Sequence, residues 1–392
     1  MAESGRVLDK VELLRGTPLP RATDEAYSTV NNNVESNYKA IYKSIGLTTM
    51  ASATLTTGRR KSGEQVLAFI GCGTLGTGIL TGIMSHVGKE GPSFVQDEEG
   101  NTEPLPFLQD QHGNHLFPPT SYIATCRSDT AVERLNAAVA EANTTGENFK
   151  VIQNDNVKAC QEADVIILGC KPYMVSGILS KPGMNKALEG KLLISICAGV
   201  AAEDIENVLY GGKPGGVDRC TIVRTMPNTA AGIGQSMTVL ATPAHPIDDS
   251  TSLLIETIFK CVGETVWLPP NLMDASTALC GSGPAFFLLL LEAAIDGGVA
   301  MGLPRAEATK MAAQTMKGAC MGVLGDKDQG RAPVHPAVLK DRVTTPGGCT
   351  IGGLMVLEDG GARGIVSKAI RAATVVASKL GAGVKNVNGA NV

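Results

Sequence analysis

The sequence predicts an α/β fold in which a Rossmann-type, doubly wound parallel sheet is followed by an all-α domain. From about residue 64 onward, short apolar runs alternate with amphipathic stretches, as the strands and helices of a parallel sheet do. The first of these runs leads directly into a glycine-rich turn. From about Leu272 the strand-like runs stop and only helical periodicity remains. The expected parts are therefore an extension (1–63), the sheet domain (64–268), the helical domain (269–385) and a tail (386–392).

The N-terminal extension has the composition of a poorly packed segment. Residues 1–63 are rich in Ser, Thr and Asn and show no sustained apolar period. Basic residues cluster within 36–63, which leaves organelle targeting as an alternative, although the acidic residues before them weaken it. The 10 cysteines are scattered without a C-x-x-C pair in apolar or mixed stretches, which is typical of buried, reduced thiols. We therefore expect a cytoplasmic protein.

Charge and hydropathy argue against nucleic acid and membrane partners. The net charge is −4 and aromatic residues make up only 4% of the chain, so neither a basic surface nor a base-stacking surface is expected. The most apolar segment, 286–295, is too short to span a bilayer and contains Glu292. We expect it to be a buried helix.

The first apolar run ends in a glycine loop suited to a dinucleotide. Gly71, Gly73 and Gly76 form the pattern G-x-G-x-x-G between the strand-like VLAFI and an apolar-striped helix, and Thr74 and Leu75 complete the loop. The first glycine permits the turn, the second lets a pyrophosphate approach the backbone, and the third lets helix and strand pack closely. The phosphates would then lie at the positive end of the helix. The alternating α/β pattern that follows favours a dinucleotide over a plain strand–helix turn.

A long insertion separates this loop from the next strand. Residues 88–119 are rich in Gly, Pro and acids, which predicts a loop. His112 and His115 have a spacing that could bind metal, but no ordered element presents them, so no metal site is expected.

The strand after the insertion, YIATC, ends at Arg127 and Ser128. NAD-preferring proteins usually carry an acid here that binds the ribose 2′-hydroxyl, and this chain has none. A guanidinium and a hydroxyl suit a 2′-phosphate instead. We interpret the following Asp129 as a helix cap. The sequence therefore favours NADPH over NADH.

Three further strand ends add candidate ligand-binding turns. One strand-like run ends at Lys171 and Pro172, and the next ends at the small residues Ala198 and Gly199, where a flat ring could approach. The sequence MPN at 226–228 follows another. Because the carboxyl ends of parallel strands share one edge of the sheet, these turns together outline one cleft.

In the helical part, the stretch VTTPGGCTIGGLMVLE places a donor-rich turn directly before a helix. A turn of Pro346, Gly347 and Gly348 can aim successive backbone amides at one anion, and the start of the helix adds a favourable dipole. An ordinary helix N-cap is the alternative role for Thr350.

Several motifs resemble those of the pyrroline-5-carboxylate reductase family. GCGTLG, ILGCKP, RTMPNT, GSGPAF, GGVAMGLP and above all VTTPGGCTIGGLMVLE occur in the family's order between about residues 66 and 380. The resemblance implies a Rossmann domain and a helical dimerisation domain that interleaves with a second protomer, and so a homodimer or a larger homo-oligomer. It also implies NAD(P)H-dependent reduction of the cyclic imine 1-pyrroline-5-carboxylate to L-proline, the last step of proline biosynthesis.

By this resemblance, the Pro-Gly-Gly loop (345–350) binds the substrate. Its amides would hold the substrate carboxylate rather than a second dinucleotide phosphate, which agrees with the lack of a preceding strand or of a second glycine motif. Thr350 would be the catalytic residue, in the sense that it orients the ring nitrogen. The substrate-binding residues implied are Thr345, Gly347, Gly348, Cys349 and Thr350, and many family members carry serine in place of Thr345.

The resemblance also extends to the cofactor pocket. Arg127 and Ser128 match the NADP-type strand ending of many family members, so NADPH is the expected cofactor. NADH stays the alternative, because the insertion places Arg127 56 positions (127 − 71) after the first glycine of the loop. The other positions that match the family's pocket are Asn156, Lys171, Pro172, Ala198 and Asn228.

Other readings of the same residues stay open. Hydride transfer to a protonated imine needs no strong acid or metal, and we expect Cys126 and Cys349 to pack rather than to act as nucleophiles. The β-hydroxyacid dehydrogenases share the two-part plan but need a catalytic lysine, for which only Lys310 and Lys317 are candidates, neither in a matching motif. A reductase of a related cyclic imino acid is closer. A non-enzymatic NADP-binding redox sensor would not need the Pro-Gly-Gly loop.

Overall fold

The structure of the protein is a computed structural model that describes residues 65–90, 94–96, 102–104, 118–142, 148–212, 218–326, 329–381, 384 and 387. By internal contacts the chain divides into two units, 1–56 and 57–392, and all the elements described below belong to the second. The predicted extension (1–63) lies outside the described residues, and so do His112 and His115.

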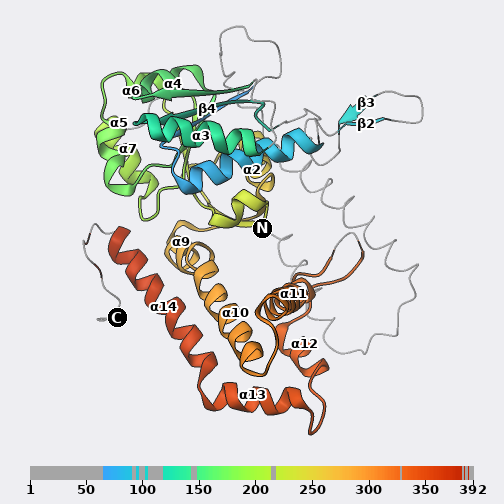
Figure 1. Cartoon of the computed structure of the whole chain (residues 1–392). Helices are drawn as coiled ribbons and strands as arrows, with labels where there is room; N and C mark the ends of the chain where they lie inside the picture. The colour runs from blue at the N-terminus through green and yellow to red at the C-terminus, as the bar shows by residue number, and fades with distance from the viewer. Residues whose placement is uncertain are drawn as a thin grey trace, which may run out of the picture. The chain divides into compact units, whose positions relative to one another are not determined.

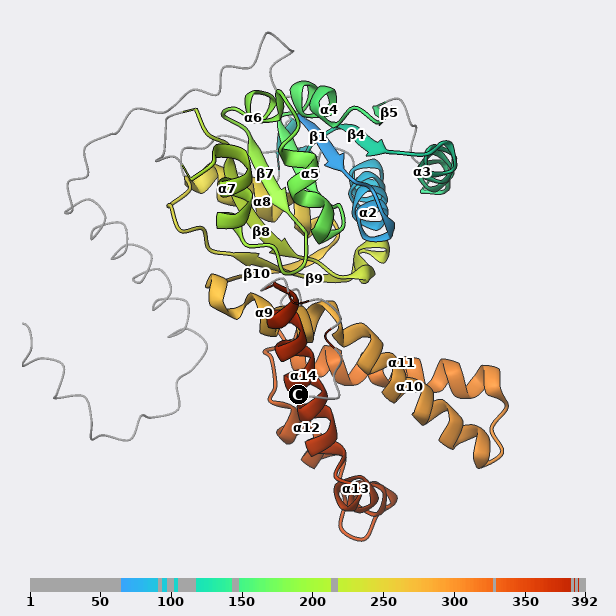
Figure 2. The ribbon, with the colours of Figure 1, turned by 90° about the vertical axis from the view of Figure 1, so that its left-hand side faces the viewer.

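An eight-stranded sheet forms the core of the fold (Figure 1). Its strands are β1 Val66–Ile70, β4 Ser121–Cys126, β5 Phe149–Gln153, β6 Val165–Leu168, β7 Leu192–Ser195, β8 Thr221–Met226, β9 Ser236–Ala241 and β10 Gly263–Leu268. The order across the sheet is β10-β9-β8-β7-β6-β1-β4-β5 (Figure 2). Every residue of β1, β6 and β7 is buried, because helices cover both faces of a doubly wound sheet.

Six neighbouring strands, from β8 to β5, run parallel, which confirms the predicted doubly wound sheet for this part. The prediction that β9 continues the parallel sheet is wrong. β9 is antiparallel to β8, with Met226 opposite Val239, and β10 is parallel to β9. The link between β8 and β9 holds only a short 3-10 turn, and a parallel pairing would need a longer crossover connection.

Helices lie over both faces of the sheet. They are α2 Thr74–Glu90, α3 Asp129–Glu141, α4 Asn156–Glu162, α5 Val175–Leu179, α6 Met184–Ala187, α7 Ala202–Tyr210 and α8 Asp249–Lys260, with 3-10 turns η4 Pro172–Met174 and η5 Thr229–Ile233. β1 divides its side chains between two buried clusters, as the two-residue period of a strand requires. Leu67 and Phe69 join the cluster of α2, α3 and α8, whereas Ala68 and Ile70 join that of α4 to α7.

The predicted insertion contains more regular structure than a loop. α2 continues to Glu90, and β2 Phe94–Gln96 pairs antiparallel with β3 Thr102–Pro104. The prediction rested on the Gly, Pro and acid content of 88–119, and composition does not show a hairpin of three-residue strands.

The elements that the structure describes after β10 are all helical. They are η6 Pro270–Leu272, α9 Met273–Ser276, a π-helical turn η7 Thr277–Gly281, α10 Gly283–Ala300, α11 Arg305–Leu324, α12 Pro336–Arg342, α13 Cys349–Asp359 and α14 Ala362–Gly381. α10 begins at Gly283 with Pro284 in its first turn, where a missing N–H costs nothing.

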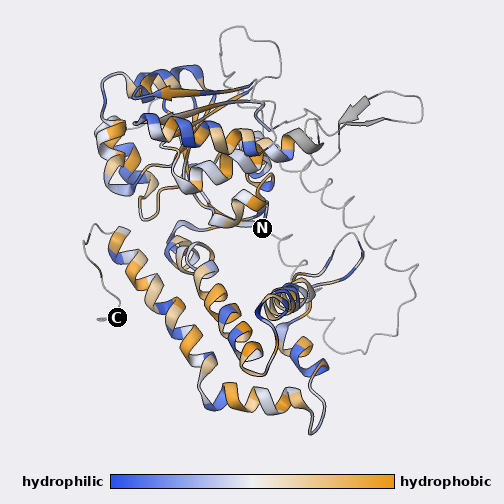
Figure 3. Ribbon diagram, in the orientation of Figure 1, coloured by the Kyte–Doolittle hydropathy of each residue, from blue (hydrophilic) through white to orange (hydrophobic). Residues whose placement is uncertain are grey.

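Much of the apolar surface of these helices is exposed. Leu288 and Leu289 of α10 are 61% and 65% exposed, which contradicts the prediction of a buried helix at 286–295. Much of α10 is coloured as hydrophobic in Figure 3. The continuous helical run Pro270–Ala300 is long and apolar enough to cross a membrane by length and composition, with 11% of its most apolar stretch buried. An apolar helix of this kind also suits a face that packs against another chain.

The cysteines follow the expected pattern only in part. All ten are free, and six of them are buried. Cys126 and Cys280 are partly buried, and burial raises the pKa of both thiols. Cys320 and Cys349 are exposed, so the predicted packing role of Cys349 is wrong for the single protomer.

Candidate active site

The glycine loop begins with a backbone turn that only glycine adopts without strain. Gly71 follows β1 with φ +84°, and its amide donates to Oγ1 of Thr125 on β4 at 3.1 Å. A Cβ added at Gly71 would lie 2.9 Å from Cα of Cys170. The loop is therefore packed against the end of β6, and the turn is closed by two neighbouring strands.

The next residues leave room for an anion at the start of α2. A Cβ added at Gly73 would meet nothing within 4 Å, and the residue is exposed. The first turn of α2, with Thr74, Leu75 and Gly76, carries no acidic residue, and the first amides of a helix have no partner within it. Arg134 of α3 donates from Nη2 to the carbonyl of Cys72 at 3.0 Å. This arrangement fits the pyrophosphate of a dinucleotide.

The end of β4 presents Arg127 and Ser128 as predicted, both exposed. Ser128, not Asp129, is the N-cap of α3, because its Oγ accepts from the amide of Ala131 at 3.3 Å. Asp129 is the first residue of the helix and accepts from Nε2 of Gln153 at 3.0 Å. Because Ser128 Oγ accepts the hydrogen bond from Ala131, its hydroxyl proton remains available for a hydrogen bond to a phosphate oxygen.

Two residues near the end of β4, Asn154 and Arg134, were not predicted as functional from the sequence. Asn154 has φ +60° and donates from Nδ2 to the carbonyl of Arg127 at 3.2 Å, which fixes the backbone that carries the guanidinium. Arg134 places a second positive charge between this strand end and the glycine loop. No local pattern signalled this role of Arg134, because its contact with Cys72 joins residues 62 positions apart.

The other predicted cofactor residues also follow the carboxyl ends of β6, β7 and β8. Lys171 and Pro172 open η4 and are exposed, and Ala198 is exposed beside Gly199. Asn228 is the N-cap of η5, with its Oδ1 accepting from the amide of Ala230 at 3.0 Å. The structure therefore brings these turns to the same edge of the sheet as the glycine loop, which we call the carboxyl edge.

Asn156 lies one strand farther out, after β5. It is the first residue of α4, whereas the preceding Asp155 is the N-cap and accepts from the amide of Lys158. The Asn156 side chain is therefore not used as a cap, and it belongs to the same edge as Arg127.

The Pro-Gly-Gly loop forms a tight turn before α13. The amide of Gly348 donates to the carbonyl of Thr345 at 3.1 Å, and Gly347 has φ +67°, as the third residue of a type II turn requires. A Cβ added at Gly348 would lie 2.4 Å from Oγ1 of Thr345, so no side chain fits there without movement. Pro346 occupies the second position of the turn, which its fixed φ favours.

The start of α13 presents free amides and a free hydroxyl. Gly348 is the N-cap, so the alternative role of Thr350 as N-cap is wrong. Thr350 is the second residue of the helix, and its hydroxyl makes no hydrogen bond within the described part of the chain. The first amides of α13 have no partner in the helix. The loop thus offers donors for an anion and one hydroxyl beside them.

The cofactor turns and the Pro-Gly-Gly loop do not meet within one protomer. α14 ends against the carboxyl edge, because a Cβ added at Gly199 would lie 3.1 Å from Cα of Gly381. α14 has 20 residues and is therefore about 30 Å long. α13 joins its opposite end, and both views place α13 there (Figures 1 and 2). Within one protomer the Pro-Gly-Gly loop therefore lies beyond the end of α14 that is remote from the carboxyl edge.

A buried arginine joins the sheet to the first helix of the helical part. Arg224 of β8 lies 3.7 Å from Oδ1 of Asp274 on α9, and its side chain is only 11% exposed. Burial lowers the pKa of the Arg224 guanidinium, and the nearby Asp274 carboxylate opposes that effect. Within the described residues, Nε and Nη2 of Arg224 have no hydrogen-bond partner. The ion pair is thus a polar link between β8 and α9.

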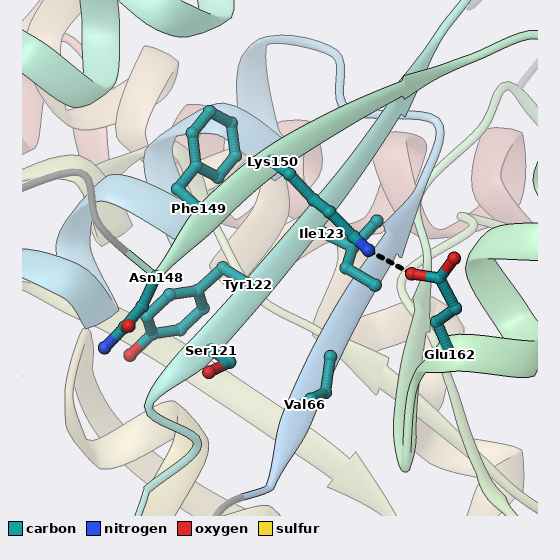
Figure 4. A pocket seen from close by; sticks show the side chains of 8 residues that line it. All are labelled: Val66, Ser121, Tyr122, Ile123, Asn148, Phe149, Lys150 and Glu162. Carbon is teal, nitrogen blue, oxygen red and sulfur yellow. Dashed lines mark hydrogen bonds and ion pairs between the residues drawn. The ribbon is translucent and has the colours of Figure 1, made fainter.

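Two hollows of the surface lie away from the carboxyl edge. A hollow of about 290 Å³ is lined by the amino ends of β1, β4 and β5, with Lys150 paired to Glu162 across its rim (Figure 4). Ligands of open α/β sheets bind at the carboxyl ends, so this hollow is not a candidate site. A larger groove between α10 and α11 is lined mainly by Leu and Ile side chains, together with Glu292 and Arg305.

The described residues hold no group of three or more His, Cys, Asp and Glu side chains that could bind a metal. Lys310 and Lys317, the candidates for a dehydrogenase lysine, are exposed on α11. Burial raises the pKa of the Cys72 thiol in the glycine loop to about 11, which keeps it protonated at neutral pH. The described residues of this arrangement can bind and orient reactants.

Comparison with known proteins places the chain among enzymes of one family. The family model described as pyrroline-5-carboxylate reductase dimerisation matches residues 270–380, and one described as NADP oxidoreductase coenzyme F420-dependent matches residues 119–199. A pyrroline-5-carboxylate reductase of Lophium arboricola is 54% identical over 333 residues, which cover 84% of this chain and 98% of that protein. One of Neurospora crassa is 49% identical over 344 residues, covering 84% and 97%.

The fold agrees with this relationship. The crystal structure of Plasmodium falciparum pyrroline carboxylate reductase with NADP bound matches with a TM-score of 0.59 at 23% identity, covering 81% of this chain and 99% of that one. It shares the sheet followed by helices. With relatives this similar over nearly their whole length, the chain belongs to the pyrroline-5-carboxylate reductase family.

Proposed function

We propose that the protein reduces the C=N bond of 1-pyrroline-5-carboxylate with NADPH and releases L-proline, as the last step of proline biosynthesis. The observation that carries the proposal is the Pro-Gly-Gly loop, whose turn leaves free amides and the Thr350 hydroxyl together at the start of α13. A cyclic imino acid presents a carboxylate next to its ring nitrogen, which suits this pair of donors. The names of the similar proteins support the same substrate.

The chain's own part in the reaction is to bind and orient. When bound, a reduced nicotinamide supplies the hydride for the imine carbon. The amides at the start of α13 hold the substrate carboxylate, assisted by the helix dipole. The Thr350 hydroxyl hydrogen-bonds the ring nitrogen and so turns the imine carbon toward the carboxyl edge. Orientation of this kind replaces the acid or metal that the site lacks among its described residues.

We propose NADPH as the preferred cofactor, because two arginines flank the place of the ribose. The exposed Arg127 guanidinium and the Ser128 hydroxyl can bind a 2′-phosphate, and Arg134 adds charge at the glycine loop. No carboxylate stands at the end of β4 to favour a free 2′-hydroxyl. The Plasmodium falciparum enzyme, whose crystal structure has NADP bound, supports this preference.

We further propose that the active unit is a homodimer whose sites each combine two chains. The carboxyl edge of one protomer would meet the Pro-Gly-Gly loop of the other, since about 30 Å of α14 separates the two within one chain. The exposed apolar residues of α10 would be covered in the same contact. The matching dimerisation model supports this assembly. All ten cysteines are free, which supports a reducing compartment such as the cytoplasm.

Turnover with substituted Thr350 tests the reaction. Purified protein is mixed with pyrroline-5-carboxylate, and the loss of NADPH absorbance is followed for the wild type, Thr350→Val and Thr350→Ser. We expect kcat to fall about 10²-fold or more in the isosteric valine variant and to recover largely in serine, because one positioned hydroxyl contributes that much. Equal turnover by wild type and valine variant would contradict the role of Thr350. NADPH binding without any turnover would favour a redox sensor, and faster turnover of a six-membered imino acid would favour the related reductase.

A mixing experiment tests the two-chain site. Gly73→Ala impairs only the cofactor half and Thr350→Val only the substrate half, so at an NADPH concentration well below saturation each variant alone should have about a tenth of the wild-type activity or less. When the two are unfolded together and refolded as a mixture, half of the dimers are mixed and one of their two sites is intact. About a quarter of the wild-type activity should therefore return. No recovery would mean that both halves of a site come from the same chain.

A further inference from the structure

Two cysteines lie side by side at the carboxyl edge. β6 and β7 are parallel neighbours with Leu168 opposite Ser195, and Cys170 and Cys197 each follow two residues beyond this pair. The Cys197 thiol donates to the carbonyl of Cys170 at 3.3 Å and to that of Leu168 at 3.4 Å. Both side chains belong to the buried cluster on the same face of the sheet. The Cys197 thiol also lies within hydrogen-bond reach of the Cys170 thiol, so the two sulfur atoms are close.

The two thiols differ in environment. Cys170 is 9% exposed, at the rim of the cofactor turns, whereas Cys197 is 1% exposed. A hydrogen bond from Cys197 lowers the pKa of the Cys170 thiol, although its partial burial opposes this. The same hydrogen bond, together with burial, raises the pKa of Cys197. This is the arrangement of an attacking and a resolving cysteine.

The backbone spacing also suits a covalent bond between them. Parallel neighbours in register lie about 4.8 Å apart, and disulfides join residues whose Cα atoms are about 4.4–6.8 Å apart. To form a disulfide, the two sulfur atoms must approach from van der Waals contact to a bond length of about 2.05 Å, and rotation of the two side chains can provide most of this approach. The remainder must come from the turns that follow β6 and β7.

We propose that Cys170 and Cys197 form a redox-active pair that a hydroperoxide converts to a disulfide, and that the disulfide weakens dinucleotide binding. The Cys170 sulfur attacks the O–O bond, forming a sulfenic acid and releasing water or an alcohol. The Cys197 sulfur then displaces that hydroxyl group from Cys170, and the proton of the Cys197 thiol leaves with it as water. Two thiols are thus oxidised by two electrons, and one hydroperoxide is reduced by two.

The disulfide would affect dinucleotide binding because both cysteines lie next to residues of the candidate cofactor site. Cα of Cys170 is the atom against which the turn of Gly71 is packed, at 2.9 Å from a Cβ built there. Lys171 and Ala198, both assigned to the cofactor pocket, follow the two cysteines directly. This part of the inference rests on the proposed function, since it presumes that a dinucleotide binds at the carboxyl edge. A shift of about 1 Å in such a turn can reduce a rate about 10²-fold.

Peptide mapping and binding together test the pair. The full chain is reduced, freed of reductant and treated with hydrogen peroxide, and its peptides are separated without reduction and identified by mass spectrometry. We expect a peptide pair linked through Cys170 and Cys197, and a loss of NADPH affinity of about tenfold or more that dithiothreitol reverses. Binding is measured without substrate, so the outcome does not depend on turnover. NADPH binding by the reduced chain checks the proposed dinucleotide site separately.

Single substitutions separate this pair from the other thiols. In Cys197→Ser the serine hydroxyl can still donate to the carbonyl of Cys170, but no disulfide can form. After treatment with peroxide and removal of the peroxide by washing without dithiothreitol, the NADPH affinity of this variant should be unchanged. Cys261→Ser, in the buried cluster on the opposite face, should lose affinity on oxidation as the wild type does. Cys170→Ala serves if the serine variant fails to fold. The proposal is overturned if the reduced chain binds NADPH but no linked pair forms, or if the pair forms and affinity is unchanged.

Discussion

Replacement of Gly71 by alanine should destabilise the fold itself. An L-residue at φ +84° pays about 1–2 kcal/mol of left-handed strain. The new Cβ would also lie 2.9 Å from Cα of Cys170, well inside the usual contact of about 3.5–4.0 Å, so the end of β6 must move. Overpacking of this kind costs about 1–3 kcal/mol. The free energy of unfolding should therefore fall by about 2–5 kcal/mol.

Gly73, two residues away, provides the matched control. It is not in the left-handed region, and a Cβ there would meet nothing within 4 Å. Gly73→Ala should therefore leave the stability unchanged or raise it by about 0.4–1 kcal/mol, because the unfolded chain loses freedom. The methyl group would nevertheless occupy the space that a pyrophosphate approaches, so NADPH affinity should fall about tenfold or more.

The chain carries its own reporter for this comparison. Trp267 is its one tryptophan, lies on β10 and donates from Nε1 to Oε1 of Glu256 at 2.7 Å. Its fluorescence follows urea unfolding of the sheet, at one protein concentration because association adds to apparent stability. Titration with NADPH gives the affinity of each variant. If Gly71→Ala is as stable as the wild type, the strain argument is wrong. If Gly73→Ala binds NADPH normally, the phosphate does not lie at this loop.

Three further outcomes are expected. Arg127→Ala should lower NADPH affinity about tenfold with little change for NADH, measured by fluorescence titration; an equal loss for both would remove the 2′-phosphate contact. Leu289→Asp should turn the dimer into a monomer in sedimentation at equal concentration, because a charge enters an apolar contact; an unchanged mass would place the contact elsewhere. Asp248→Ala should cost about 1 kcal/mol in urea unfolding at pH 7, because its carboxylate caps α8 through the amide of Thr251 at 2.7 Å. Partial burial raises the pKa of Asp248, but hydrogen bonds from Ser250 and Thr251 outweigh it and lower the pKa below its value in the unfolded chain. The stability difference should therefore be full above the unfolded-state pKa and should shrink as pH falls from there through the lowered folded-state pKa.

The features that the sequence could predict are those determined by contacts within a few residues. The apolar run before Gly71 had to be a covered strand, and the turn after it had to be glycine, because both follow from contacts within a few residues and from the handedness of the backbone. The same holds for the restart of α10 at Pro284. The Pro-Gly-Gly turn likewise depends on Thr345, Pro346 and its two glycines.

The errors arose where distant parts of the chain decide. SMTVLA is as apolar as the parallel strands, and only the short link after β8 reverses its direction. Asp129 and Ser128 are both good caps, and the choice between them depends on Gln153 of the neighbouring strand, which holds the Asp129 carboxylate. Leu288 and Leu289 had the composition of a buried helix, but the described part of the chain leaves them 61% and 65% exposed.

The two halves of the candidate active site also depend on distant parts of the chain, so the sequence alone could not predict that they are separated within one protomer. Motifs for cofactor and substrate occur in one sequence, and sequence order suggests one pocket. In the fold, α14 contacts the carboxyl edge at Gly381 and carries α13 at its other end, about 30 Å away along the helix, so Thr350 lies beyond that end of α14. A helix of 20 residues cannot shorten that distance by side-chain movement. The proposed second chain therefore accounts for two observations. It would cover the exposed apolar face of α10, and it would complete the site whose two halves are separated within one protomer.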